Sequence, residues 1–178
     1  MLRAFLALLT LISLSGCSTY AVSRYSNSAD NVVALRSLKG KTVNVGPFTA
    51  VEAGRREIMC RGVGPIKTPD GETYEEFIQK ALAAELKLAE IYSSSAPVTL
   101  TGNLNRIDFS STSGAAWELS LTVLSSNGKS ITVDENYKYK SSYYGETACN
   151  QTAQALMPAI QDMIGKVVNH PEFAALLQ

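Results

Sequence analysis

The stretch that decides the fold is residues 117–139, WELSLTVLSSNGKSITVDENYKY. Apolar and polar residues alternate on both sides of a central turn, and this period of two predicts a pair of strands with one buried face. A two-residue Asn127-Gly128 turn would set apolar positions opposite polar ones. A three-residue loop over 126–128, with Gly128 in the left-handed conformation, pairs 123 with 131, 121 with 133 and 117 with 137. We therefore predict a hairpin with this longer loop.

The segment before the hairpin, residues 97–109, predicts a third strand that contains a bulge. Its apolar residues fall into two groups of opposite parity, first Val98, Leu100 and Leu104 and then Ile107 and Phe109. A strand cannot change its buried face without an extra residue, so we place a bulge near Asn105-Arg106.

Two long amphipathic helices flank these strands. Thr73 and Glu76 have the spacing of a capping box that opens a helix over 73–92. A second apolar stripe runs over 147–168, with Pro158 inside it. A short helix over 31–38 and a strand over 42–48 come earlier in the chain. This order predicts an α+β fold, in which an antiparallel meander sheet has both long helices packed on one face.

The chain begins with a positive charge at Arg3, an apolar run over 4–14 and then small residues, which is the pattern of a secretory signal peptide. The run ends in Leu14-Ser15-Gly16-Cys17, which resembles the lipobox of bacterial lipoproteins. That resemblance implies cleavage before Cys17, diacylglycerol on its sulfur and acylation of the new amino group. Ser18 at the next position resembles the class that is sorted to the outer membrane. The alternative is an ordinary secreted protein in which Cys17 is a chance residue.

We therefore divide the chain into a cleaved signal peptide (1–16), a lipidated Ser-rich tether (17–30) and a single globular domain (31–178). The expected location is the outer membrane, with the domain anchored by lipid on the periplasmic face. The chain has 16 Lys and Arg residues against 16 Asp and Glu residues. This balance, together with an envelope location, argues against nucleic acid as a partner.

If Cys17 carries lipid, Cys60 and Cys149 remain as an even pair in an oxidising compartment. We predict a disulfide between them, which would close a loop of about 90 residues. Two buried free thiols are the alternative. A zinc site is disfavoured because two cysteines and the distant His170 do not have the spacing of metal ligands.

Glu85 falls inside the apolar face of the helix predicted over 73–92. A buried carboxylate needs a partner, and two kinds of role follow. The functional role is a general acid or a ligand anchor. The structural role is a pair with Arg106 or Arg61, or with a backbone group. Glu135 raises the same question opposite Leu119.

Two further groups are candidate contact sites. Four cations precede the helix at 73: Arg55, Arg56, Arg61 and Lys67. Beside a helix N-terminus they could receive an anion, although such clusters are more often solvated surface. Tyr143 and Tyr144 follow the last strand and predict an exposed patch for a partner.

The sequence favours a non-catalytic protein. The one histidine, His170, lies beside a proline near residue 178, so a serine nucleophile would lack a well-placed base. We expect an accessory or assembly component of the envelope, without cofactor or metal, that contacts another envelope protein through a sheet edge or the tyrosine-bearing loop. The alternative is a carrier that binds a small amphiphile or anion between sheet and helices. An enzyme would need Glu85 or Glu135 in an open cleft beside a second titratable group.

Overall fold

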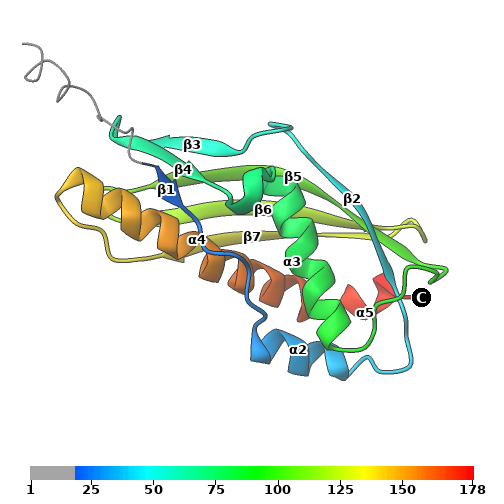
Figure 1. Cartoon of the computed structure of the whole chain (residues 1–178). Helices are drawn as coiled ribbons and strands as arrows, with labels where there is room; N and C mark the ends of the chain where they lie inside the picture. Colours follow the sequence, from blue (N-terminus) through cyan, green and yellow to red (C-terminus); the bar gives the residue numbers. More distant parts are fainter. Residues whose placement is uncertain (1–18) are drawn as a thin grey trace, which may run out of the picture.

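The computed structural model describes residues 19–178, so the predicted signal peptide over 1–16, Cys17 and Ser18 lie outside the described residues. The chain folds as α+β, as predicted (Figure 1). Its elements are β1 (Tyr20–Ala21), α2 (Ala29–Arg36), β2 (Asn44–Ala50), β3 (Glu57–Cys60), β4 (Gly64–Lys67), a 3-10 turn η1 (Pro69–Gly71), α3 (Tyr74–Leu88), β5 (Thr99–Ser110), β6 (Ala116–Ser125), β7 (Ser130–Lys138), α4 (Gly145–Val168) and α5 (Phe173–Leu176).

The main sheet has four strands in the order β2-β5-β6-β7. The predicted hairpin is confirmed: Val123 pairs with Ile131 and Trp117 with Tyr137, and Gly128 is left-handed with φ 87°. The predicted bulge in β5 is also confirmed, because the register between β5 and β6 shifts between residues 104 and 106. The antiparallel meander therefore comprises β5, β6 and β7. At its edge β2 pairs with β5 in parallel, with a second register shift between residues 45 and 48.

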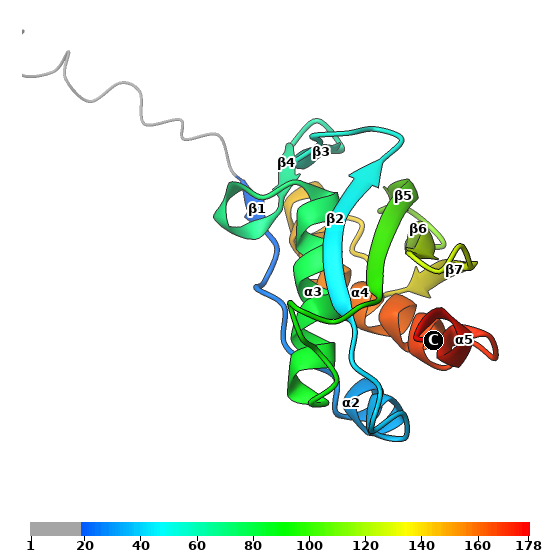
Figure 2. The same ribbon diagram turned by 90° about the vertical axis from the view of Figure 1, so that its right-hand side faces the viewer.

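The helices α3 and α4 cover one face of this sheet, and α2 packs across both of them (Figure 2). α3 begins with the predicted capping box, in which the Thr73 side chain accepts a hydrogen bond from the Glu76 backbone and the Glu76 carboxylate accepts one from the Thr73 backbone. Trp117 is fully buried between sheet and α4, and its indole N–H donates to the Thr152 carbonyl oxygen at 2.8 Å. Burial of a residue this large contributes strongly to the core.

A second, smaller sheet of order β1-β4-β3 flanks the main one at the end where α4 begins. β3 and β4 form a hairpin, and β1 pairs with β4 in parallel, so that Tyr20 lies opposite Ile66. The predicted disulfide is present between Cys60 on β3 and Cys149 on α4, whose Cα atoms are 5.8 Å apart. It therefore joins the small sheet to the helical layer.

Candidate functional site

The N-terminal segment lies along the domain from Tyr20 onward. Val22 is buried, and its backbone N–H donates to the Lys67 carbonyl oxygen at 2.9 Å. Arg24 makes a bidentate pair with Asp70, with nitrogen–oxygen distances of 2.7 and 2.9 Å. The described part of the expected tether is thus fastened to the body rather than extended away from it.

Glu85 on α3 is the centre of this attachment, and its side chain is 0% exposed. Its Oε1 accepts a hydrogen bond from the Tyr25 hydroxyl at 2.6 Å and another from the Ser28 backbone N–H at 2.8 Å. The amides of Asn27 and Asn31 approach the carboxylate at 3.5 Å. Of the partners predicted for Glu85, the structure shows the backbone group, which is the Ser28 N–H. Neither candidate arginine is involved.

The phenol of Tyr25 is perturbed by this arrangement. Burial raises the pKa of Tyr25, and its hydrogen bond to the Glu85 carboxylate raises it further. The phenol therefore stays protonated and remains a donor to Glu85 through the neutral pH range. We call Tyr25, Ser28 and Glu85 the N-terminal clamp.

Glu135 on β7 also has a structural partner. It is largely buried, and its Oε2 lies 3.1 Å from the Lys166 ammonium group of α4. The same ammonium group donates to the Asp134 carbonyl oxygen at 2.6 Å. Both carboxylates that could support catalysis are thus engaged in joining one element to another.

The four cations before α3 do not converge on one point. Arg55 pairs with Glu52 at 2.6 Å and Lys67 with Glu57 at 3.2 Å, and the Arg56 side chain is exposed. Arg61 lies at the far tip of the β3–β4 hairpin, because β3 separates it from the other arginines. An anion site built from all four is therefore not formed.

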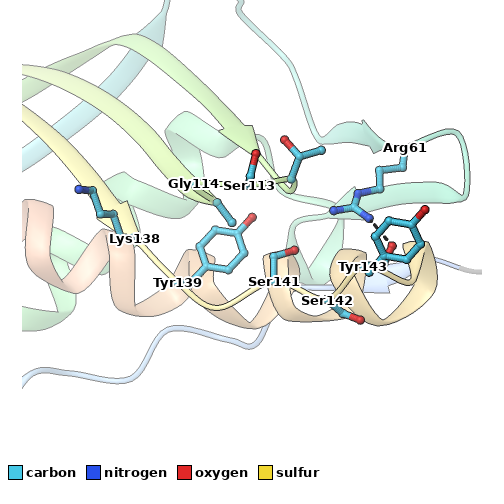
Figure 3. Close-up of a pocket in the computed structure, with 10 residues that line it drawn as sticks. Arg61, Ser113, Gly114, Lys138, Tyr139, Ser141, Ser142 and Tyr143 are labelled. Atoms are coloured by element: carbon cyan, nitrogen blue, oxygen red, sulfur yellow. Dashed lines mark hydrogen bonds between the residues drawn. The ribbon is translucent and has the colours of Figure 1, made fainter.

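Arg61 instead meets Tyr143 at an open hollow of about 660 Å³ (Figure 3). The lining residues come from the β3–β4 tip, the β5–β6 connection and the segment after β7: Arg61, Thr112, Ser113, Gly114, Ala115, Lys138, Tyr139, Ser141, Ser142 and Tyr143. The polar groups of this lining are hydroxyls, one guanidinium and one ammonium group. We call it the Arg61 hollow.

Arg61 is held in place by hydrogen bonds to neutral groups. Its Nε donates to the Ser111 hydroxyl at 3.0 Å, its Nη1 to the Tyr143 carbonyl oxygen at 3.0 Å, and its Nη2 to the Ser111 carbonyl oxygen. Its backbone is left-handed, with φ 48°, a conformation that costs a non-glycine residue about 1–3 kcal/mol. Within residues 19–178, the ion pairs do not include Arg61, so its charge is not neutralised by a carboxylate.

Tyr139 also lines the hollow. Its hydroxyl donates to the Ser110 carbonyl oxygen at 2.9 Å and lies 2.8 Å from the Thr152 hydroxyl of α4. Burial raises the pKa of Tyr139, so the phenol is neutral at physiological pH. The hollow therefore combines neutral hydrogen-bonding groups with positive charge.

Tyr143 lines the hollow, and its ring forms an edge-to-face pair with the neighbouring Tyr144, with ring centroids 6.2 Å apart. They are 94% and 76% exposed, which makes them the most exposed large apolar side chains of residues 19–178. The exposure agrees with the sequence analysis. The sequence did not reveal that Arg61, one of the four cations, lies beside them.

The layer between sheet and helices, where a carrier would hold its ligand, is filled by side chains. Leu121 of β6 and Leu156 and Ile160 of α4 are 0–1% exposed in this layer. Of the helices within residues 19–178, none has the length and apolarity to cross a membrane.

No family model and no curated protein sequence matches the chain, but solved structures do. A protein from Xanthomonas campestris with the family model DUF330 is 13% identical, with a TM-score of 0.51, over 85% of this chain and 95% of that one. A hypothetical protein from Chlamydia trachomatis is 8% identical, with a TM-score of 0.49, over 75% and 97%. A candidate lipoprotein from Caulobacter crescentus is 17% identical, with a TM-score of 0.41, over 84% and 96%. At 13% identity, the similarity to the Xanthomonas campestris protein shows a shared fold alone and carries no information on activity.

Proposed function

We propose that this chain is a lipoprotein of the bacterial envelope, anchored through Cys17 to the outer membrane with its domain on the periplasmic face. The supporting observation is that the lipobox leads almost directly into the body. In the sequence only Ser18 and Thr19 lie between Cys17 and Tyr20, and from Tyr20 the chain is fastened to β4 and then to Glu85. A body held so close to its anchor suits work at a membrane surface. The Cys60–Cys149 disulfide suits the oxidising envelope.

Replacement of Cys17 tests the anchor. In cells that express the full chain, Cys17→Ala should move the protein from the membrane fraction to the soluble periplasmic fraction. Thr19→Ala leaves the lipobox intact and should remain with the membrane. Density separation of the two membranes should place the wild type in the outer one. A Cys17→Ala protein that still sediments with membranes would refute the anchor.

The proposed task is a non-catalytic accessory role, in which the domain binds another envelope protein. Glu85 and Glu135 favour this role because their carboxylates are engaged by Tyr25 and Ser28 and by Lys166. The carrier alternative would need space in the layer that Leu121, Leu156 and Ile160 occupy.

The outer edge of β7 is the best surface for such a partner. Within the described residues, β7 pairs with β6 alone and runs over nine residues without proline or glycine. The opposite edge strand, β2, contains Pro47, which lacks a backbone N–H, and its ladder is interrupted between Val45 and Phe48. An added strand therefore finds a longer ladder at β7 that no proline interrupts, and it would have to replace the hydrogen bond that Lys166 donates to the Asp134 carbonyl oxygen.

Site-specific photocrosslinking in intact cells tests the β7 edge. A photoreactive residue at Asn136 on β7 should yield a discrete crosslinked band that contains a second envelope protein. The same residue at Val33 on α2, which is also exposed, is the matched control. Equal crosslinking at both positions, or none at Asn136, would contradict a partner at this edge.

A further inference from the structure

The first step concerns where the chain leaves the domain toward its lipid. β1 is parallel to β4, so Thr19, where the described chain begins, lies toward the start of β4 and the β3–β4 tip. From Cys17 to Thr19 an extended chain spans at most about 7 Å. This inference rests on the lipid anchor proposed above, and the anchor would place that tip next to the membrane.

The second step concerns what else lies at this end. Ile66, the partner of Tyr20, is three residues from Val63, a distance of about 10 Å along an extended chain. Val63 in turn contacts the start of α4, because its Cγ2 lies only 3.0 Å from the position of a Cβ added at Gly145. The exposed rings of Tyr143 and Tyr144 directly precede that glycine. β1, the β3–β4 tip and the start of α4 indeed gather at one end of the molecule (Figure 1).

The third step concerns charge. Arg61 and Lys138 line the hollow, and Lys140 is an exposed neighbour on the same segment. None of the three belongs to an ion pair within residues 19–178. Glu146 in the first turn of α4 is the acidic residue of this segment, which leaves an excess of positive charge. Each basic residue near an anionic membrane contributes about 1 kcal/mol of attraction.

We propose that this end of the domain rests on the membrane surface and binds anionic lipid headgroups. The rings of Tyr143 and Tyr144 enter the interface, where amphipathic aromatic side chains are favoured. The Arg61 hollow receives the phosphate of a headgroup, with Lys138 as its cation and serine hydroxyls as donors. The lipid on Cys17 keeps this surface in contact with the bilayer, so each single contact can be weak.

Fluorescence quenching in vesicles tests the orientation. The lipidated protein is reconstituted into phosphatidylcholine vesicles that contain phosphatidylglycerol and lipids with a quencher near the headgroup. Trp117 is the one native tryptophan and is fully buried, so it provides a constant background. Tyr144→Trp should be strongly quenched. Leu124→Trp, also exposed but at the opposite end of β6, is the control and should keep its emission.

The outcomes separate this inference from the anchor. Vesicle flotation of the same samples reports the anchor, and failure to float would defeat the anchor and this inference together. Flotation without quenching of Tyr144→Trp would overturn the inference alone. Equal quenching of Leu124→Trp would also overturn it, since the domain would then have no preferred face. The indole of Tyr144→Trp could also be shielded from quencher in native envelopes but not in vesicles. That result would assign the two tyrosines to a protein partner and would also overturn the inference.

A second measurement addresses the headgroup. Protein with Cys17→Ser lacks the lipid, and it should still bind vesicles containing phosphatidylglycerol more tightly than vesicles of phosphatidylcholine alone. Lys138→Gln together with Lys140→Gln should reduce this preference by about thirtyfold, as expected for two basic contacts of about 1 kcal/mol each. Lys129→Gln at the opposite end is the matched control. An unchanged preference in the double variant, or inhibition by inorganic phosphate with no preference between vesicles, would overturn headgroup binding.

Discussion

Replacement of Glu85 should release the N-terminal segment and destabilise the domain. The carboxylate is fully buried and makes its two short hydrogen bonds to residues 25–28 through Oε1. Glu85→Ala removes that oxygen and leaves the Tyr25 hydroxyl and the Ser28 N–H without an acceptor. Glu85→Gln retains an amide oxygen of similar position, so it separates the loss of charge from the loss of the acceptor.

The expected sizes follow from the two bonds of 2.6 and 2.8 Å. A hydrogen bond to a charged group contributes about 1.5–3 kcal/mol, so loss of both bonds in Glu85→Ala should lower the free energy of unfolding by about 3–6 kcal/mol. Hydrogen bonds between neutral groups are about half as strong, so Glu85→Gln should lose about 1.5–3 kcal/mol. Tyr25→Phe removes the shorter bond alone and should also lose about 1.5–3 kcal/mol.

Urea unfolding followed by the fluorescence of buried Trp117 measures the free energy, with Cys17→Ser protein as the common background. Hydrogen exchange of residues 20–28 reports the clamp locally, and Glu85→Ala should abolish protection there while β6 stays protected. Equal losses for Glu85→Ala and Glu85→Gln would show that the acceptor geometry does not matter. Unchanged exchange over 20–28 in Glu85→Ala would refute the clamp.

Three further predictions follow from the core. Removal of the disulfide by Cys60→Ala with Cys149→Ala should lower the free energy of unfolding by up to about 4–5 kcal/mol, because the unfolded chain regains the freedom of a loop of about 90 residues. Urea unfolding measures this loss, and wild-type protein in reductant should show the same loss. Gly102→Ala should cost about 1–3 kcal/mol, since the new Cβ would lie 2.5–2.7 Å from ring carbons of Phe48, and Phe48→Leu should recover part of that loss in thermal unfolding. Burial raises the pKa of the Tyr74 phenol, so the folded state keeps a proton that the unfolded chain releases above about pH 10. Stability from this group is therefore complete below that pH and falls as pH rises beyond it, and Tyr74→Phe should show a shallower alkaline decline in urea titrations; an equal slope would contradict the argument.

Local patterns predicted the central hairpin, the β5 bulge and the capping box of α3, because each depends on neighbours in sequence. The parity of Val123 and Ile131 allows only one loop length that keeps both on the same face, and the structure has that register. The parallel pairing of β2 with β5 depends on residues more than 50 positions apart. No periodicity within 42–48 indicates which strand it joins or in which direction.

The candidate sites also depend on contacts between residues that are distant in sequence, which local patterns do not predict. Glu85 was identified as buried from its place on a helical face, but its partners Tyr25 and Ser28 lie in a serine-rich stretch without periodicity. The large apolar side chains of Val22 and Tyr25 were the sequence signal that this stretch packs against the domain. Arg61 and Tyr143 are 82 residues apart, and the β3–β4 hairpin brings them together.

The clamp also has a mechanical consequence. If the lipid anchor is present as proposed, a pull on the domain away from the bilayer enters at residue 20, where β1 holds β4 through two residue pairs. The force then reaches the Arg24–Asp70 pair and the contacts of Glu85. These few bonds lie outside the disulfide-closed core, so they should rupture first. Nine freed residues would then let the body stand off from the bilayer by up to about 30 Å while the Cys60–Cys149 link keeps the rest folded. The N-terminal attachment would thus open under tension and increase the distance that the domain can span from the bilayer, while the domain itself stays folded.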